Sequence, residues 1–189
     1  PVMNEFWRYP FILNVGPTLI LPVAIIIKFL GFSVALARIP MIGYILATSI
    51  AMYWYAYRIH GRLTAQWATA LLVTLSAFIN TGKPVLGEIP AFFFLLMGVI
   101  TLKHHPHIHQ SARAGIWLGL SVLTKLTYGL IYPALGVTWL AALIARDIKQ
   151  LRALTITVGA TGFILIKVLP SRPEAAFNVS SFKRQPYGT

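Results

Sequence analysis

Residues Ile39 to Tyr57 read IPMIGYILATSIAMYWYAY, a run of apolar and small residues without a charge. Its length is close to the roughly 20 helical residues that cross the hydrocarbon core of a bilayer. Backbone N–H and C=O groups in lipid must be satisfied within the structure, and a helix does this inside a single segment. The stretch therefore predicts a transmembrane helix, with Arg38 and Arg58 just outside its two ends.

The composition extends this prediction to the whole chain of 189 residues. It is 57% hydrophobic and 11% charged, with a mean hydropathy of +0.73, whereas a soluble domain carries roughly a quarter charged residues. The net charge of +12 comes from basic residues that lie between apolar runs, which is typical of membrane topology and argues against nucleic-acid binding. Cysteine is absent, so disulfides, thiolate metal sites and cysteine nucleophiles are excluded.

Further apolar runs predict a polytopic, all-α transmembrane bundle of about five to six spans. The predicted spans are 39–57, 65–79, 89–102, 114–127, 129–145 and 154–169. The fourth and fifth come from one apolar stretch, which we divide near Thr127 because it is too long for one span. If its first half does not cross the bilayer, this stretch forms a re-entrant hairpin instead.

The remaining segments complete one transmembrane domain over residues 1–189. The segment 17–31 is short, contains Pro22 and carries Lys28, so we expect a juxtamembrane helix whose lysine reaches the membrane surface. Residues 170–189 are polar and are expected to form an outer loop or tail. Because the chain begins at Pro1 without a methionine, we expect it to be a piece of a longer protein.

The basic residues predict how the helices are oriented, since Lys and Arg in short loops favour the cytoplasm. They gather in every second connection: Arg58, Arg62, Lys103, Arg113, Arg146, Lys149 and Arg152. Lys83 is the single basic residue of the loop 80–88. This pattern predicts that 80–88 and the tail after Pro170 lie outside.

Glu88 is the only acid between Phe6 and Arg146. It precedes the apolar run 89–102, with Pro90 close behind it. A carboxylate at a helix N-terminus is stabilised by the helix dipole, and proline often starts a helix, so capping explains Glu88. Charged groups at membrane depth are often functional, so a role in binding substrate or metal or in an active site is the alternative.

Lys125 and a histidine cluster are the other candidates for chemistry. Lys125 ends an apolar run, where its ammonium would either hold a phosphate or extend to the membrane surface as an anchor. The cluster at 104–109 reads HHPHIH. Its spacing matches no zinc template, and we interpret it as part of a loop, with no metal site predicted.

Several short pieces of the chain, taken in order, resemble one known family. They are Gly16–Pro22, Leu30–Ser33, Ala37–Pro40, Gly82–Glu88, Ala91–Leu96 and Gly119–Lys125. With their spacing, the chain from about Asn14 to Pro133 resembles the GT-C superfamily of polyprenyl-phosphate-sugar-dependent glycosyltransferases. Within that superfamily it is similar to bacterial family 39-like enzymes related to protein mannosyltransferases and aminoarabinose transferases.

The resemblance implies a GT-C-like fold and inverting transfer of a sugar from a polyprenyl phosphate to a protein, lipid or glycan acceptor at the extracytoplasmic face. Glu88 matches the acidic position of the family's second outer loop, and Lys125 matches a basic residue after the Gly-rich helix. Lys125, Lys83 and Arg38 would stabilise the lipid phosphate leaving group. The family's main catalytic acid is expected upstream of Pro1. The resemblance leaves the cofactor undetermined, and a metal requirement stays open.

This resemblance also implies a multi-pass protein of the bacterial plasma membrane that contacts membrane lipid. The residues alone leave two other classes open. A transporter or lipid-carrier flippase would also combine many helices with one acid at the membrane edge. A structural membrane subunit would make both Glu88 and Lys125 replaceable.

Overall fold

The structure, a computed structural model, describes residues 15–82, 86–102 and 108–168, and every regular element in those ranges is helical. This confirms the predicted all-α class. The elements are α1 (Pro17–Leu30), α2 (Val34–Ala37), α3 (Ile39–His60), α4 (Arg62–Thr74), α5 (Ser76–Gly82), α6 (Glu88–Leu102), α7 (Ile108–Thr124), the 3-10 helix η3 (Leu126–Leu130), α8 (Ile131–Ile144) and α9 (Ile148–Val168).

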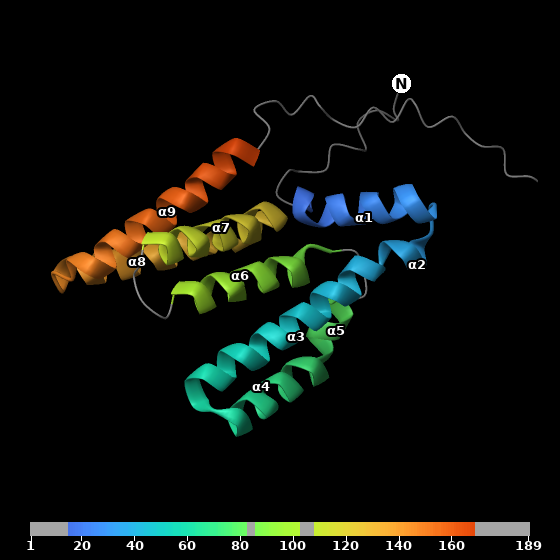
Figure 1. Cartoon of the computed structure of the whole chain (residues 1–189), viewed down its shortest axis with the longest axis horizontal. Helices are drawn as coiled ribbons and strands as arrows, with labels where there is room; N and C mark the ends of the chain where they lie inside the picture. Colours follow the sequence, from blue (N-terminus) through green and yellow to red (C-terminus); the bar gives the residue numbers. More distant parts are fainter. Residues whose placement is uncertain (1–14, 83–85, 103–107, 169–189) are drawn as a thin grey trace, which may run out of the picture.

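Four helices, α3, α6, α7 and α9, lie side by side in a row (Figure 1). α4 packs against α3 at one side of this row, and α8 packs against α9 and shares a core cluster with α7. α6 and α7 are antiparallel, because Ser121 near the end of α7 donates to the carbonyl of Ala91 near the start of α6. α7 and α9 are parallel, because residues 111 and 115 meet residues 157 and 161. Successive long helices therefore alternate in direction along the chain.

Small residues let α7 and α9 approach closely. A Cβ on Gly115 would lie 2.4 Å from the carbonyl oxygen of Thr157, and one on Gly119 would lie 3.0 Å from Cβ of Ile164. Thr161 donates across this contact to the carbonyl of Gly115 at 3.0 Å. Glycine spacing of this kind, with threonine hydroxyls as donors, is typical of helix packing in membranes.

The core lies between the helices of this row and the shorter elements that pack on them. Leu19, Met41, Phe78 and Ile89 join α1, α3, α5 and α6 near one end. Farther along α6 and α7, the rings of Phe94 and Trp117 stack with their centroids 5.9 Å apart and join these two helices. The outer faces carry large apolar side chains that are exposed within this one chain, such as Leu130, Val137 and Ile144 on η3 and α8. Lipid is the environment that suits such faces.

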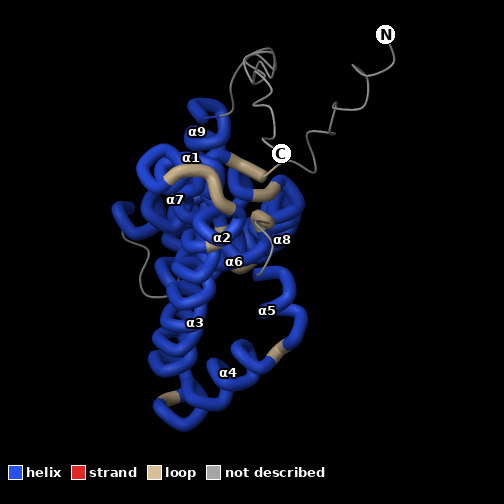
Figure 2. Tube along the Cα trace, turned by 90° about the vertical axis from the view of Figure 1, so that its right-hand side faces the viewer, coloured by secondary structure: helices blue, strands red, loops and turns tan. Residues whose placement is uncertain are grey.

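Several helix bounds differ from the predicted spans. The run predicted at 65–79 breaks at Leu75 into α4 and α5, whose axes differ by 58°. Figure 2 shows α4 at the edge of the molecule, where it packs mainly against α3, whereas α5 returns toward α3 and α6. α1 ends at Leu30, and Gly31 caps it with a φ of 86°, a conformation that glycine adopts readily.

Two helices among the described residues are long and apolar enough to cross a membrane, Val34–His60 and Leu126–Ile144. The bent pair Arg62–Thr74 and Ser76–Gly82 would be a third if it forms one span. α1 and α6 are apolar but shorter. The six predicted spans and the juxtamembrane position of 17–31 stay predictions.

Candidate functional site

Glu88 and Lys125, which are 37 positions apart, form an ion pair at one end of the bundle. The antiparallel packing of α6 on α7 brings them together, because Glu88 begins α6 and Lys125 directly follows α7. The Nζ of Lys125 donates to Oε1 of Glu88. The side chains are 21% exposed for Lys125 and 30% for Glu88. Two of the four predicted site residues thus share one site.

The local sequence explains where each charge lies. Glu88 stands in the first turn of α6, followed by the buried Pro90, and this position favours a negative charge. Lys125 has extended backbone angles, with φ −153° and ψ 119°, which end α7. A cation beside the C-terminus of a helix is favoured by the same dipole. Each charge is therefore stabilised by its own helix end as well as by its partner.

The second carboxylate oxygen of Glu88, Oε2, is buried and has no hydrogen-bond partner among the described residues. The backbone carbonyl of Glu88 accepts a hydrogen bond from the hydroxyl of Tyr128 at 3.2 Å. Buried carboxylate oxygens normally have a partner. The site therefore contains an acceptor without a donor, next to an ammonium.

A polar layer beneath the pair ties α1, α3 and α7 together. The amide of Gly16 donates to the carbonyl of Thr124 at 2.9 Å, and the hydroxyls of Thr18 and Thr124 lie 2.6 Å apart. The hydroxyl of Tyr44 donates to the carbonyl of Thr18 at 3.1 Å. A Cβ on Gly16 would lie 1.5 Å from the carbonyl oxygen of Leu123, so only glycine allows this approach. The start of α1 is thereby held against the end of α7.

An apolar depression of about 360 Å³ adjoins this end of the bundle. It is lined by Leu95, Thr127, Tyr128, Leu130 and Ile131. Tyr128 belongs to both features, since it lines the depression and bonds Glu88. The depression and the ion pair are therefore neighbours.

The other predicted residues lie apart from the pair or outside the described part of the chain. Arg38 is exposed at the N-cap of α3, and none of the contacts described for it joins it to Glu88 or Lys125. Lys83 falls outside the described residues, as do His104, His105 and His107. Across 15–82, 86–102 and 108–168, no group of three or more metal-ligating side chains occurs.

The sequence interpretation missed Thr18, Tyr44, Ser121 and Tyr128 as parts of this end of the molecule. The hydroxyls of Tyr44, Ser121 and Tyr128 donate to backbone carbonyls of other elements, and that of Thr18 contacts the hydroxyl of Thr124. Such partners cannot be identified from spacing along the chain. Tyr128 carried a weak signal, because it is a polar residue within an apolar stretch only three positions after Lys125.

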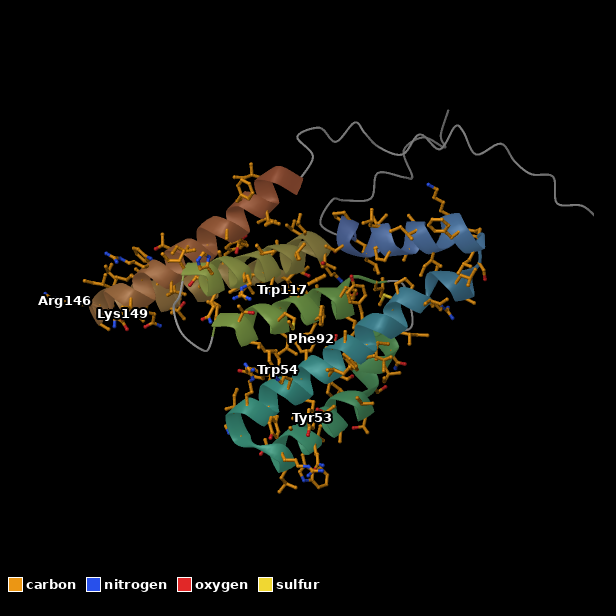
Figure 3. All side chains as sticks on the ribbon, viewed as in Figure 1. Tyr53, Trp54, Phe92, Trp117, Arg146 and Lys149 are labelled. Carbon is orange, nitrogen blue, oxygen red and sulfur yellow. The ribbon has the colours of Figure 1, made fainter. Side chains whose placement is uncertain are left out.

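The opposite end of the bundle is basic. Figure 3 shows Arg146 and Lys149 at the end of α8 and the start of α9, far along the bundle from α1. The helix directions place Arg58, Arg62 and Arg113 at this end as well. Its one described acid, Asp147, accepts hydrogen bonds from the amides of Lys149 and Gln150 at 3.1 Å and so caps α9.

Comparison with known proteins gives one match. Residues 24–183 match the family described as dolichyl-phosphate-mannose-protein mannosyltransferase. The match covers most of the chain and includes both residues of the ion pair. No curated protein and no solved structure matches the chain.

Proposed function

Because the chain belongs to the dolichyl-phosphate-mannose-protein mannosyltransferase family, we propose that it transfers a sugar from a polyprenyl-phosphate donor to an acceptor at the extracytoplasmic face of a bacterial plasma membrane. The family consists of integral membrane glycosyltransferases that use such donors. The acceptor is a hydroxyl of a protein, lipid or glycan. The predicted orientation, with the basic end in the cytoplasm, supports the choice of face.

The observation that carries this proposal is the Glu88–Lys125 pair beside an apolar depression. A polyprenyl-phosphate sugar combines an apolar chain, a phosphate and a set of hydroxyls. Lys125 supplies a cation for the phosphate, which gains negative charge as the sugar leaves. Glu88 supplies a carboxylate that accepts hydrogen bonds from sugar hydroxyls. Arg38 and Lys83 are proposed as further cations for the phosphate.

Inverting transfer also needs a general base that takes the proton of the acceptor hydroxyl. Neither described acid suits this role. The family resemblance assigns the main catalytic acid to another position than Glu88, and Asp147 caps α9 at the opposite end of the bundle. We therefore assign Glu88 to binding and orienting the substrate, and the base to a carboxylate outside the described residues.

The test is transfer of a radiolabelled sugar from polyprenyl-phosphate donors by the full-length protein in liposomes. Lys125→Met should lower kcat/KM for the donor about 10- to 100-fold, because a hydrogen bond to a charged group contributes roughly 1.5–3 kcal/mol. Glu88→Gln should also abolish most transfer. Lys28→Met, which removes an exposed lysine in the last turn of α1, is the matched control and should transfer normally.

Two outcomes would contradict the proposal. If the wild-type protein transfers no sugar from a broad panel of donors, the chain is not part of a transferase of this kind. If Lys125→Met and Glu88→Gln both transfer at the wild-type rate, the pair is not in the substrate site.

A further inference from the structure

We propose that the Glu88–Lys125 ion pair is a resting contact that the phosphate of the ligand opens. The phosphate takes Lys125 from Glu88, and the released carboxylate accepts a hydrogen bond from a hydroxyl of the same ligand. The inference rests on the proposed function, since it describes how the same site is controlled. It makes the pair selective for a phosphate ester that carries a hydroxyl near its phosphate.

Unused hydrogen-bonding capacity at both residues is the first argument. An ammonium has three donors, and among the described residues Lys125 Nζ uses one of them, toward Oε1 of Glu88. Oε2 of Glu88 is buried and unpartnered in the same part of the structure. The site therefore offers spare donors and a spare acceptor side by side. A phosphate would accept hydrogen bonds from the spare donors of Lys125, and a hydroxyl would donate to the spare acceptor of Glu88.

The low cost of separating the two charges is the second argument. Both side chains are partly exposed, and ion pairs in such positions are weak. Once separated, Glu88 still lies at the N-terminus of α6, and Lys125 still lies at the C-terminus of α7. Each helix end continues to stabilise its charge. Opening the pair therefore leaves neither charge without compensation.

Competition between anions for Lys125 is the third argument. A phosphate monoester presents one more non-ester oxygen than a carboxylate, and a phosphate diester presents as many. Both form strong charge-assisted hydrogen bonds with an ammonium. Lys125 has the long flexible side chain needed to turn from one anion to the other. Its position just after α7, where the backbone is already extended, lets the side chain move without unwinding the helix.

Removing the charge of Glu88 should strengthen the binding of a lipid phosphate that lacks a sugar, although Glu88 lies in the binding site. A polyprenyl monophosphate has no sugar hydroxyl that could donate to the released carboxylate. Glu88 therefore only competes with the phosphate for Lys125. Glu88→Gln should therefore bind this lipid about two- to fivefold more tightly than the wild type does, as expected from removing a weak ion pair. The same variant should lose sugar transfer.

The experiment is a double-mutant cycle on the full-length protein in nanodiscs, with polyprenyl monophosphate as the probe. Lys125→Met should bind more weakly than the wild type. In the Lys125→Met background, Glu88→Gln should have no effect, because no lysine remains to be released. Lys28→Met is the control for a lost positive charge and should bind as the wild type does.

Two results would overturn the resting contact. The first is weaker binding by Glu88→Gln, which would make Glu88 a direct ligand or a structural support. The second is equal tightening in both backgrounds, which would show simple repulsion between the carboxylate and the phosphate. Glu88→Asp keeps the charge but shortens the side chain, so it should also bind more tightly. This variant serves as the second test if Glu88→Gln fails to fold.

The same measurements separate this proposal from the proposed function. Sugar transfer by the wild type, without tighter lipid binding by Glu88→Gln or Glu88→Asp, would refute the resting contact and keep the transferase. If the wild type neither binds the lipid nor transfers sugar, both proposals are refuted.

Discussion

Ser121 shows how a single hydroxyl stabilises the end of the bundle that carries the ion pair. Its side chain is fully buried and donates to the carbonyl of Ala91 at 2.8 Å, which links α7 to α6 one turn below Lys125. Most other hydroxyls in the helices bond to a carbonyl of their own helix; Ser49, which donates to Ile45, is an example. A bond such as that of Ser121 joins two helices, whereas a bond such as that of Ser49 stays within one.

We therefore predict that Ser121→Ala destabilises the protein and that Ser49→Ala, the matched control, does not. Hydrogen bonds between membrane helices contribute about 0.6 kcal/mol on average and at most about 1.7 kcal/mol. The measurement is the free energy of unfolding of each variant in detergent, monitored by tryptophan fluorescence. Equal stability of the two variants would show that the Ser121 bond does not couple the helices.

At the scale of elements, the contact between α7 and α9 depends on the glycines of α7 that face α9, and not on Gly159 of α9. A Cβ at Gly115 would meet the backbone oxygen of Thr157, which cannot move without shifting α9. Gly159 lies on α9 with nothing within 4 Å of a Cβ placed on it. The two glycines differ in surroundings although both are within helices.

Gly115→Ala should consequently lower the free energy of unfolding by about 1–3 kcal/mol, the usual cost of overpacking a close contact. Gly159→Ala should be neutral or stabilising by up to about 1 kcal/mol, because alanine favours helix more than glycine does. Thermal unfolding of both variants in the same detergent compares them. Destabilisation of the same size in both would contradict close packing of α7 on α9.

At the scale of the whole molecule, the two ends differ in chemistry. One end carries Glu88, Lys125 and a layer of hydroxyls around the start of α1. The other carries most of the described basic residues and the acid that caps α9. Alternating helix directions produce this separation, since each basic connection returns to the same end. The basic end is predicted to face the cytoplasm.

The absence of cysteine from the sequence makes this orientation simple to test. Single cysteines at Arg62 and Lys149 should react with a membrane-impermeant maleimide only when the cytoplasmic face is accessible. A cysteine at Arg38 should react from the opposite face. Labelling of Arg62→Cys and Lys149→Cys from different faces would refute the predicted topology and the alternation of spans.

The candidate site could be predicted from the sequence only in part. Glu88 and Lys125 stand out because charges within apolar runs are costly, and each was identified from its own surroundings. Their ion pair was not predicted, because it depends on how α6 packs on α7. Arg38 was grouped with them on the basis of the family resemblance, and the structure shows no hydrogen bond or ion pair that joins Arg38 to either residue.

Composition and hydropathy by themselves determined that this protein is a helical membrane protein. This follows because apolar surface and backbone satisfaction in lipid are properties of each segment alone. The sequence did not predict the bend at Leu75 between α4 and α5. The tertiary structure also decided which helices lie next to each other, which glycines permit close contact, and that Glu88 meets Lys125. These features depend on contacts between distant segments, and hydropathy along the chain carries no information about partners.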